Sequence, residues 1–328
     1  MILVITNKED AHPTPVIEKL SARGVPVFRL NTESLLTDYE FCWQADNSGC
    51  DFTIHCPANS LSVRGSEITA LWDRRPEKPE ELPITVTPQI DKHNRTEALG
   101  FLVFLRYYLK DIPSIGSIVN DKPAASKMLQ YKIAVEVGFY IPDTCFSNRK
   151  SYIAQLAGRH SQLTVKPIEN SNIWDEERGV EWVFYTRKIE SSSIAEAPEE
   201  AFSQTVSFVQ NYVEKAFELR VTVVSSRVFA CKIDSQRQTD DTGKTDWRQG
   251  YEHGMAQTAV QLPGEIADRC IEYLRRMGLN FGCFDFIVTP EGRYVFLECN
   301  PNGQWLWVEL ATGLPISEAI VDFLTAKN

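Results

Sequence analysis

Two polar side chains end an apolar strand near the C-terminus of the chain. In residues 296–300 (FLECN), Glu298 and Asn300 lie on one side, because side-chain direction in a strand repeats every two residues. Removing a carboxylate and an amide from water costs several kcal/mol unless another group binds them. The spacing therefore indicates a ligand at the end of this strand.

A hairpin would bring a third oxygen donor to the same place. The sequence TPEG (289–292) joins two apolar runs and is a strong hairpin signal. With a two-residue tip, Asp285 lies across from Phe296 and diagonal to Glu298, about 7–8 Å away between backbones. Two carboxylates and an amide on one sheet face suit Mg²⁺. Asp285 alone would more often cap a turn, and Glu298 alone would more often be a solvated strand end, but the joint pattern favours the metal.

Phosphoryl chemistry needs cations besides the metal, which bridges phosphate oxygens and offsets developing charge. Lys127 opens a helix predicted over 126–138, and Lys166 lies in a strand predicted over 162–168. A lysine is a movable point charge that suits phosphate oxygens. A single lysine is more often a solvated surface group. A phosphate-binding role for these two lysines therefore depends on the residues around them.

A further strand presents two more charged side chains. Residues 217–223 alternate in polarity, which is the period-two pattern of a half-buried strand. We expect the face that carries Glu218, Arg220 and Thr222 to border a cleft or solvent.

The elements that position these residues follow an α/β order. The chain opens with strand, helix and strand (1–7, 13–24, 25–31) and lacks the GxGxxG of a dinucleotide site. The polar stretch 169–180 is expected to be a loop. Further predicted elements are a strand at 68–75, a helix around 90–110, a strand at 182–189, a helix at 264–277 ended by Gly278, and strands at 280–288 and 292–300.

Composition excludes several classes of protein. The 328 residues are 43% hydrophobic and 24% charged, with a net charge of −10, which is globular and argues against a nucleic-acid partner. No apolar run reaches 18 residues, and the N-terminus lacks the basic region of a signal peptide, so we expect no membrane partner and a cytoplasmic location. The eight cysteines show no metal-ligand spacing and are interpreted as reduced thiols.

The order of these parts resembles an ATP-grasp ligase. Lys127, Lys166, the segment QNYV before EKAFELR, and the hairpin with Asp285 occur in that order. More specific stretches resemble the microviridin-type peptide cyclases, the graspetide synthetases, over nearly the full chain. These stretches are MILVITN, VFRLNTE, ITALWDRR, FELRVTVV, FACKIDSQ, TDWR, MGLNFGCFDFIVTPEGRYVFLECNPNGQWLWVEL and TGLPISEAI.

The resemblance implies an α/β ATP-grasp fold in three parts. Residues 1–118 would form an N-terminal pre-ATP-grasp domain, 119–206 a small central domain, and 207–328 a C-terminal antiparallel-sheet domain. The leader of a precursor peptide would dock on the central domain. The match is weak over 168–205, so no leader-binding residue is assigned.

The resemblance also implies roles for individual residues. Glu218 would bind the ribose of ATP, and Arg220 the phosphates or an acyl phosphate. Lys127 and Lys166 would bind the phosphates of ATP. The backbone of the hinge, which is Gln210, Asn211, Tyr212 and Val213, would bind the adenine. The three oxygen donors, Asp285, Glu298 and Asn300, would bind two Mg²⁺ ions. Two features depart from the family pattern: the hinge has Gln210-Asn211 where an acidic residue is common, and 169–180 has no glycine-rich turn.

The implied activity is ring closure in a ribosomal precursor peptide made of leader and core. An Asp or Glu side-chain carboxylate attacks the γ-phosphate of ATP, which gives an acyl phosphate and ADP. A Ser or Thr hydroxyl, or a Lys amine, of the same peptide then displaces phosphate and closes an ester or amide ring. The family resemblance also suggests a homodimer.

Other aromatic and cationic residues have two interpretations each. Arg248, with Arg74 and Arg75, would lie near the site or form surface and domain contacts. Trp305 and Trp307 share a face if the chain there is extended, and would be core aromatics or line a peptide cleft.

Two alternative functions remain. A ligase that adds free amino acids to a peptide or protein would share the ATP machinery, and WDRR and QWLW weigh against it by resemblance. A non-catalytic ATP-binding regulatory protein would be expected to lack a metal ligand or a phosphate lysine, and none of the five is missing.

Overall fold

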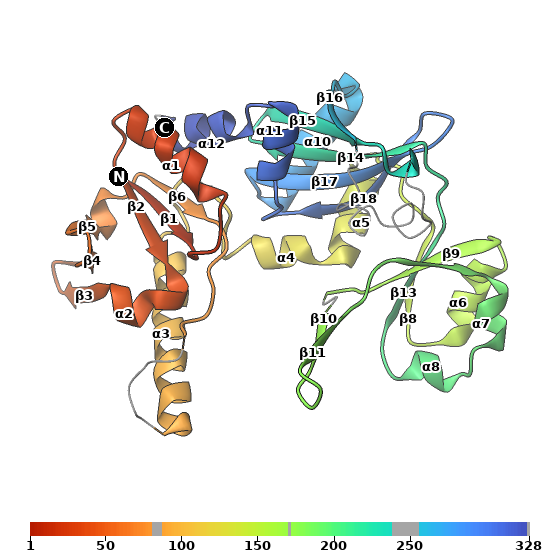
Figure 1. Ribbon diagram of the computed structural model, residues 1–328, viewed down its shortest axis with the longest axis horizontal. Helices are drawn as coiled ribbons and strands as arrows, with labels where there is room; N and C mark the ends of the chain where they lie inside the picture. Colours follow the sequence, from red (N-terminus) through yellow and green to blue (C-terminus); the bar gives the residue numbers. More distant parts are fainter. Residues whose placement is uncertain (81–86, 170–171, 238–255, 327–328) are drawn as a thin grey trace.

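The computed structural model describes residues 1–80, 87–169, 172–237 and 256–326. Three regions are visible in Figure 1: an N-terminal domain, a large C-terminal sheet, and a small central domain below that sheet. Helix α4 (Asp121–Ala125) lies between the N-terminal domain and the other two regions. Within the described residues, no helix combines the length and apolar character needed to cross a membrane.

The N-terminal domain has a parallel sheet in the order β2-β1-β6-β7. Strand, helix and strand form at its start as expected, and Gly24 takes a positive φ of 69° after the helix. A second, antiparallel sheet and the long helix α3 complete the domain. Its elements are β1 (Ile2–Thr6), α1 (Pro13–Ala22), β2 (Val27–Asn31), α2 (Leu35–Asp38), β3 (Glu40–Asp46), β4 (Gly49–Cys56), β5 (Leu61–Arg64), β6 (Ala70–Asp73), α3 (Pro88–Tyr108) and β7 (Ser114–Ile115).

The central domain is an antiparallel sheet, ordered β12-β9-β13-β8, that packs on short helices. Its core is small and includes Ile153, Leu163 and Phe202. The elements are α5 (Lys127–Glu136), which leads into it, β8 (Thr144–Ser147), α6 (Lys150–Ala157), β9 (Gln162–Lys166), β12 (Arg187–Glu190), α7 (Ser192–Glu196), α8 (Glu200–Ser203) and β13 (Ser207–Asn211).

The loop expected at 169–180 is wrong at 172–175 and at 180, where strands form. Strands β10 (Asn172–Asp175) and β11 (Val180–Val183) pair as a hairpin that projects from the central domain (Figure 1). The charged run DEER (175–178) concealed this pattern, because it covers the end of β10 and most of the turn between two short segments rich in β-forming residues. The strand expected at 182–189 is accordingly divided between β11 and β12.

The C-terminal sheet is antiparallel in the order β16-β15-β14-β17-β18. Helices α10 and α5 cover one face, where Leu219, Phe284 and Phe296 are buried. Its elements are β14 (Phe217–Val224), β15 (Arg227–Ile233), β16 (Gln257–Val260), α10 (Gly264–Met277), β17 (Phe281–Val288), β18 (Tyr294–Asn300), α11 (Leu306–Thr312) and α12 (Ile316–Thr325).

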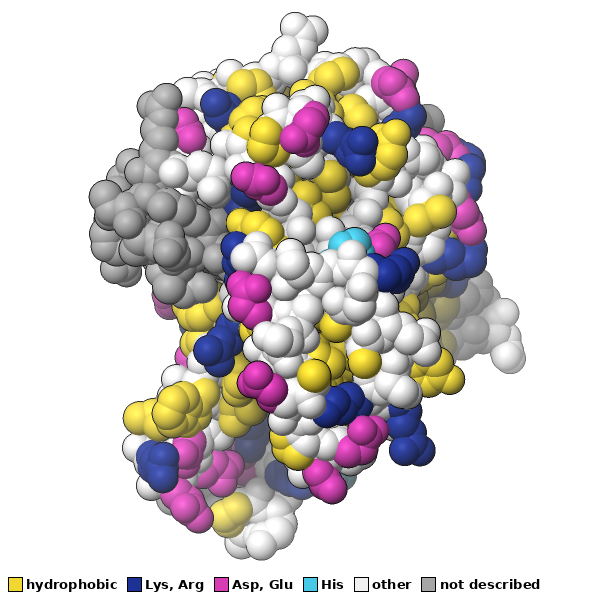
Figure 2. Space-filling view, turned by 90° about the vertical axis from the view of Figure 1, so that its right-hand side faces the viewer, with side chains coloured by type: hydrophobic (Ala, Val, Ile, Leu, Met, Phe, Trp, Pro, Cys, Tyr) yellow, Lys and Arg dark blue, Asp and Glu magenta, His cyan; other side chains and the backbone are white. Residues whose placement is uncertain are grey.

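One hydrophobic core joins the two ends of the chain. Side chains of β1 and α1 pack with α12 and with the second face of the C-terminal sheet, and Trp305 and Ile320 belong to the same cluster. The boundaries proposed at 118 and 206 stay a prediction. On the face shown in Figure 2, basic and acidic side chains are intermixed around apolar ones, and no field of one sign dominates.

Candidate active site

The hairpin that carries the oxygen donors forms, but in a different register from the one expected. Asp285 pairs directly with Glu298, and Phe286 with Phe296, so strand β18 contains a bulge at Leu297. The turn also has three residues at its tip, ended by Gly292 at φ 81°. The two one-residue shifts together preserve side-chain parity, so Asp285 still shares a face with Glu298.

The bulge has a packing reason. It turns Phe296 into the buried core while Glu298 faces the opposite side, which an unbroken period of two would forbid. The hydroxyl of Tyr131 donates to the carbonyl of the bulged Leu297 at 2.7 Å. This contact from α5 satisfies a carbonyl at the irregularity.

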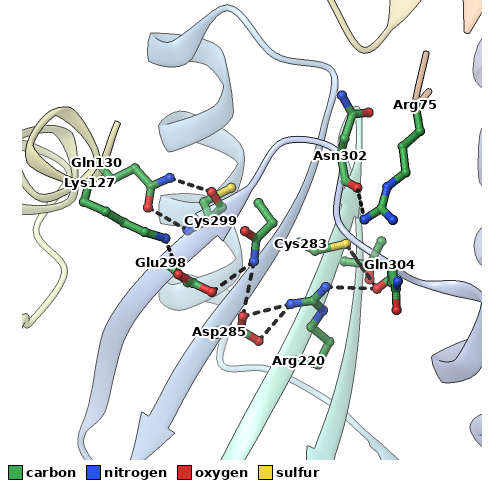
Figure 3. A network of polar contacts seen from close by, with 12 residues as sticks. Arg75, Lys127, Gln130, Arg220, Cys283, Asp285, Glu298, Cys299, Asn302 and Gln304 are labelled. Carbon is green, nitrogen blue, oxygen red and sulfur yellow. Dashed lines mark hydrogen bonds and ion pairs between the residues drawn. The ribbon is translucent and has the colours of Figure 1, made fainter. Parts of the chain in front are cut away.

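The side chains of the three predicted donors converge as expected, and Figure 3 shows Asp285 and Glu298 close together. Asn300 Nδ2 lies 3.4 Å from Asp285 Oδ2 and 3.2 Å from Glu298 Oε1. The side chain of Gln130, from α5, accepts from the N–H of Cys299 (3.1 Å) and donates to its carbonyl (2.7 Å), between the two β18 donors. The α5 helix thereby fixes the end of the edge strand.

Two cations are already paired with these carboxylates. Lys127 Nζ donates to Glu298 Oε2. Arg220 Nη1 contacts both Asp285 oxygens, at 3.0 and 2.8 Å. Burial disfavours the charged guanidinium, but the Asp285 carboxylate outweighs it and raises the pKa of Arg220.

A cleft of about 860 Å³ lies between the central domain and the C-terminal sheet, and most of the predicted site residues line it. Its lining includes Lys127, Lys166, Gln210, Asn211, Tyr212, Val213, Glu218, Arg220, Asp285, Glu298 and Asn300. Thr222 does not join them, because it is fully buried beside Cys283. Arg248 lies outside the described residues. The roles assigned to these side chains remain predictions.

Comparisons with known proteins agree with this arrangement. Residues 1–120 match the family model described as the MvdD pre-ATP grasp domain. A RiPP-associated ATP-grasp ligase from Chryseobacterium gregarium superposes with a TM-score of 0.89 at 27% identity, covering 98% of this chain and 96% of that one. The macrocyclase MdnC from Microcystis aeruginosa superposes with a TM-score of 0.83 at 26% identity, and the match covers 98% of each chain. The macrocyclase MdnB from the same organism superposes with a TM-score of 0.77 at 25% identity, and the match covers 99% of each chain.

The chain has the ATP-grasp fold. The resemblance to microviridin-type peptide cyclases is confirmed by these nearly full-length matches. A comparison with curated proteins gave no match.

The hinge of this ATP-grasp fold is closely braced. The Gln210 side chain is buried and donates to Tyr131 and Thr144, at 2.9 Å each. The N–H groups of Asn211 and Tyr212 donate to carbonyls of Asp143 (3.0 Å) and Gln162 (2.9 Å). These contacts hold the backbone that the resemblance assigns to adenine.

Sequence reasoning missed Lys215 and Ser235. Lys215 is 7% exposed and forms an ion pair with the buried Glu218, to which Ser235 also donates at 3.1 Å. The only sequence signal for this ion pair was that Lys215, of opposite charge, lies three residues before Glu218. The pair lines the cleft and neutralises a carboxylate that would otherwise be costly to bury.

The segment after Asn300 is held by arginines from two parts of the ATP-grasp chain. Arg74 Nη1 donates to the Asn302 carbonyl at 2.5 Å, and Arg75 Nη2 reaches the same oxygen at 3.4 Å. Arg220 Nη2 donates to the Gln304 carbonyl at 3.0 Å. Arg75 therefore lines the cleft, as one of the two interpretations proposed, whereas the buried Arg74 makes the domain contact of the other.

The extended chain assumed for the two tryptophans is wrong. Helix α11 begins at Leu306, so Trp305 and Trp307 point to different surroundings. Trp305 is fully buried and packs edge to face on His12, with ring centroids 5.5 Å apart. Trp307 lines the cleft.

Proposed function

We propose that this protein is an ATP-dependent peptide macrocyclase. It activates Asp or Glu side chains of a ribosomal precursor peptide as acyl phosphates, releasing ADP. Ser or Thr hydroxyls, or Lys amines, of the same peptide then displace phosphate and close ester or amide rings. The observation that carries the proposal is one cleft holding Asp285, Glu298 and Asn300 beside Lys127 and Arg220.

The donor set fits magnesium. Two carboxylates and the side-chain amide of Asn300 lie on one face of neighbouring strands, and Lys127 and Arg220 supply the positive charge beside them. We assign two ions to this set. When bound, Mg²⁺ would offset the negative charge of the phosphates as the phosphoryl group moves.

The cations of the cleft suit the nucleotide phosphates. Lys127 lies on α5 and Lys166 at the end of β9, and both line the cleft. A metal bound to Glu298 would compete with Lys127 for that carboxylate and leave the ammonium group to bind phosphate. Glu218, held by Lys215, supplies a fixed acceptor for the ribose hydroxyls.

The set of hinge residues proposed to bind adenine can be reduced. Because the N–H groups of Asn211 and Tyr212 are used within the protein, we assign the adenine contact to the backbone of Val213 and to carbonyls of the same segment. Arg220 remains charged at any working pH and lies beside Asp285, so it can stabilise the acyl phosphate and the phosphate that leaves.

Partners follow from the same proposal. The precursor would supply a leader for docking and a core for ring closure; the C. gregarium ligase is described in complex with ADP and with a leader and core peptide. We also propose a homodimer, and the exposed aromatic rings on β3 and α3, including Trp43 and Tyr107, offer a surface for it. ATP use and eight free thiols support a cytoplasmic setting.

Mass spectrometry of a candidate precursor incubated with the protein, ATP and Mg²⁺ tests the proposal. Ring closure predicts successive losses of one water, about 18 Da each, that depend on ATP. Mass gains equal to amino acid residues would instead establish an amino-acid ligase. ATP binding without change in any candidate peptide would indicate a regulatory protein.

A further inference from the structure

The adjacent residues Arg74 and Arg75 face the Asn302 carbonyl in different environments. Arg74 is 1% exposed, lies 3.3 Å from Asp10 Oδ2 and is enclosed between the N-terminal domain and the 301–304 segment. Arg75 is exposed and lines the cleft (Figure 3). Arg74 therefore holds the 301–304 segment against the N-terminal domain, whereas Arg75 is accessible to a ligand in the cleft.

Arg75 differs from the other cleft arginine in its pairing. Arg220 has Asp285 as its ion-pair partner. Within the described part of the chain, the side chain of Arg75 has one polar contact, the 3.4 Å hydrogen bond to Asn302, and no carboxylate partner. A guanidinium carries five N–H donors, so this single hydrogen bond leaves most of them available to a ligand in the cleft that Arg75 lines.

Positive charge accumulates at this point. Burial lowers the pKa of Arg74 to about 10; the Asp10 carboxylate opposes this shift, and the charges of Arg75 and Arg220 add to it. Arg75 and Arg220 approach the same short segment from opposite sides, at the carbonyls of Asn302 and Gln304 (Figure 3). An anion bound beside Arg75 would offset the charge that Arg75 adds next to Arg74.

We propose that Arg75 binds the side-chain carboxylate of the peptide residue that is to be activated. The inference rests on the proposed function, because it names the group that receives the acidic substrate. A planar guanidinium matches a carboxylate through paired N–H donors. The N-terminal domain would thus contribute directly to acid recognition, beyond its contacts with the sheet.

Location favours the peptide carboxylate over a nucleotide phosphate. The lysines assigned to phosphate, Lys127 and Lys166, lie on the α5 and central-domain side of the cleft. Arg75 follows β6 of the N-terminal domain and contacts the segment two residues beyond Asn300. A carboxylate held there would lie beside the proposed metal site, where its desolvation requires an opposite charge.

The test compares Arg75→Gln and Arg75→Lys with Arg64→Gln, an exposed arginine on β5 that does not line the cleft. The probe is a precursor peptide that the wild type dehydrates with ATP. We expect Arg75→Gln to raise the KM for peptide about tenfold to hundredfold, the loss typical of one charge-assisted contact. The KM for ATP should change less than twofold, Arg75→Lys should recover part of the loss, and Arg64→Gln should match the wild type.

A second arm removes the partner instead. With Asp and Glu of the core replaced by Asn and Gln, wild type and Arg75→Gln should bind the peptide equally in the presence of ADP and Mg²⁺. An unchanged peptide KM in Arg75→Gln, a rise in the KM for ATP instead, or a binding difference that persists with the amide peptide would overturn the proposal. Failure of the proposed function is distinguishable, since the wild type would then dehydrate no peptide.

Discussion

Asp285 and Glu298 face each other directly across β17 and β18, and each already holds a cation, Arg220 for Asp285 and Lys127 for Glu298. These two carboxylates are thus each paired with a cation before any ligand enters. Bringing in a divalent metal requires these ion pairs to be exchanged, and the two carboxylates should therefore respond differently to substitution.

Glu298→Gln should lower kcat for peptide-dependent ADP release by on the order of 100-fold or more, because a carboxamide is a weaker magnesium ligand. The fold should persist, since the change is nearly isosteric. Steady-state ADP release measures the effect, and Glu291→Gln at the exposed hairpin tip is the matched control. Near-normal turnover in Glu298→Gln would contradict the metal assignment.

Asp285→Asn should destabilise the ligand-free protein more than Glu298→Gln does. Its partner Arg220 has a side chain only 7% exposed, and stranding a buried charge costs about 3 kcal/mol. Lys127 is more accessible, at 16%, so losing its partner should cost about 1 kcal/mol or less. Urea unfolding without nucleotide or metal gives both values; equal losses would argue against this ranking.

Gly303→Ala should displace the segment bound by the arginines. A Cβ there would lie 2.4 Å from Cys283 Cβ and 2.7 Å from its Sγ, inside the packed sheet. We expect a loss of about 1–3 kcal/mol in stability, together with reduced turnover. In Gly100→Ala, on the interior of α3, the new Cβ meets nothing within 4 Å and should stabilise by about 0.5–1 kcal/mol. Thermal unfolding of the pair checks both signs.

Asp121 should make stability depend on pH. Burial raises the pKa of Asp121 to about 7 and the Asp73 charge adds to the shift, while hydrogen bonds from the Ser117 N–H and from Asn302 Nδ2, at 2.5 Å, oppose it. Because the folded pKa exceeds the unfolded value, the native state binds the extra proton, and stability falls as pH rises from about 4 to 7. The free energy of unfolding of Asp121→Asn relative to wild type should therefore increase between pH 5 and 8. A difference independent of pH would contradict the raised pKa; Asp111→Asn, on an exposed carboxylate, is the control.

The parts of the site that could be predicted from sequence are those that depend on the alternation of side-chain direction along one strand. Glu298 and Asn300 share a face whatever the rest of the sheet does, and Glu218 and Arg220 follow from one alternating strand. The register between Asp285 and Glu298 could not be predicted, because the bulge at Leu297 depends on Phe296 packing against distant helices.

Other features depended on contacts far apart in the chain. The ion pair of Lys215 with Glu218 and the contact of Gln130 with Cys299 require tertiary placement that no local pattern encodes. The β10–β11 hairpin was missed for a different reason. Its charged turn dominated the composition of 169–180 and concealed two short strands.

The most direct test of the central claim follows the oxygen atoms of the activated carboxylate. A precursor peptide labelled with ¹⁸O in its Asp and Glu carboxylates is cyclised with ATP and Mg²⁺, and the released inorganic phosphate is analysed by mass spectrometry. An acyl phosphate predicts one ¹⁸O in each phosphate and one retained in the new ester or amide carbonyl. Unlabelled phosphate accompanying ring closure would contradict the mechanism.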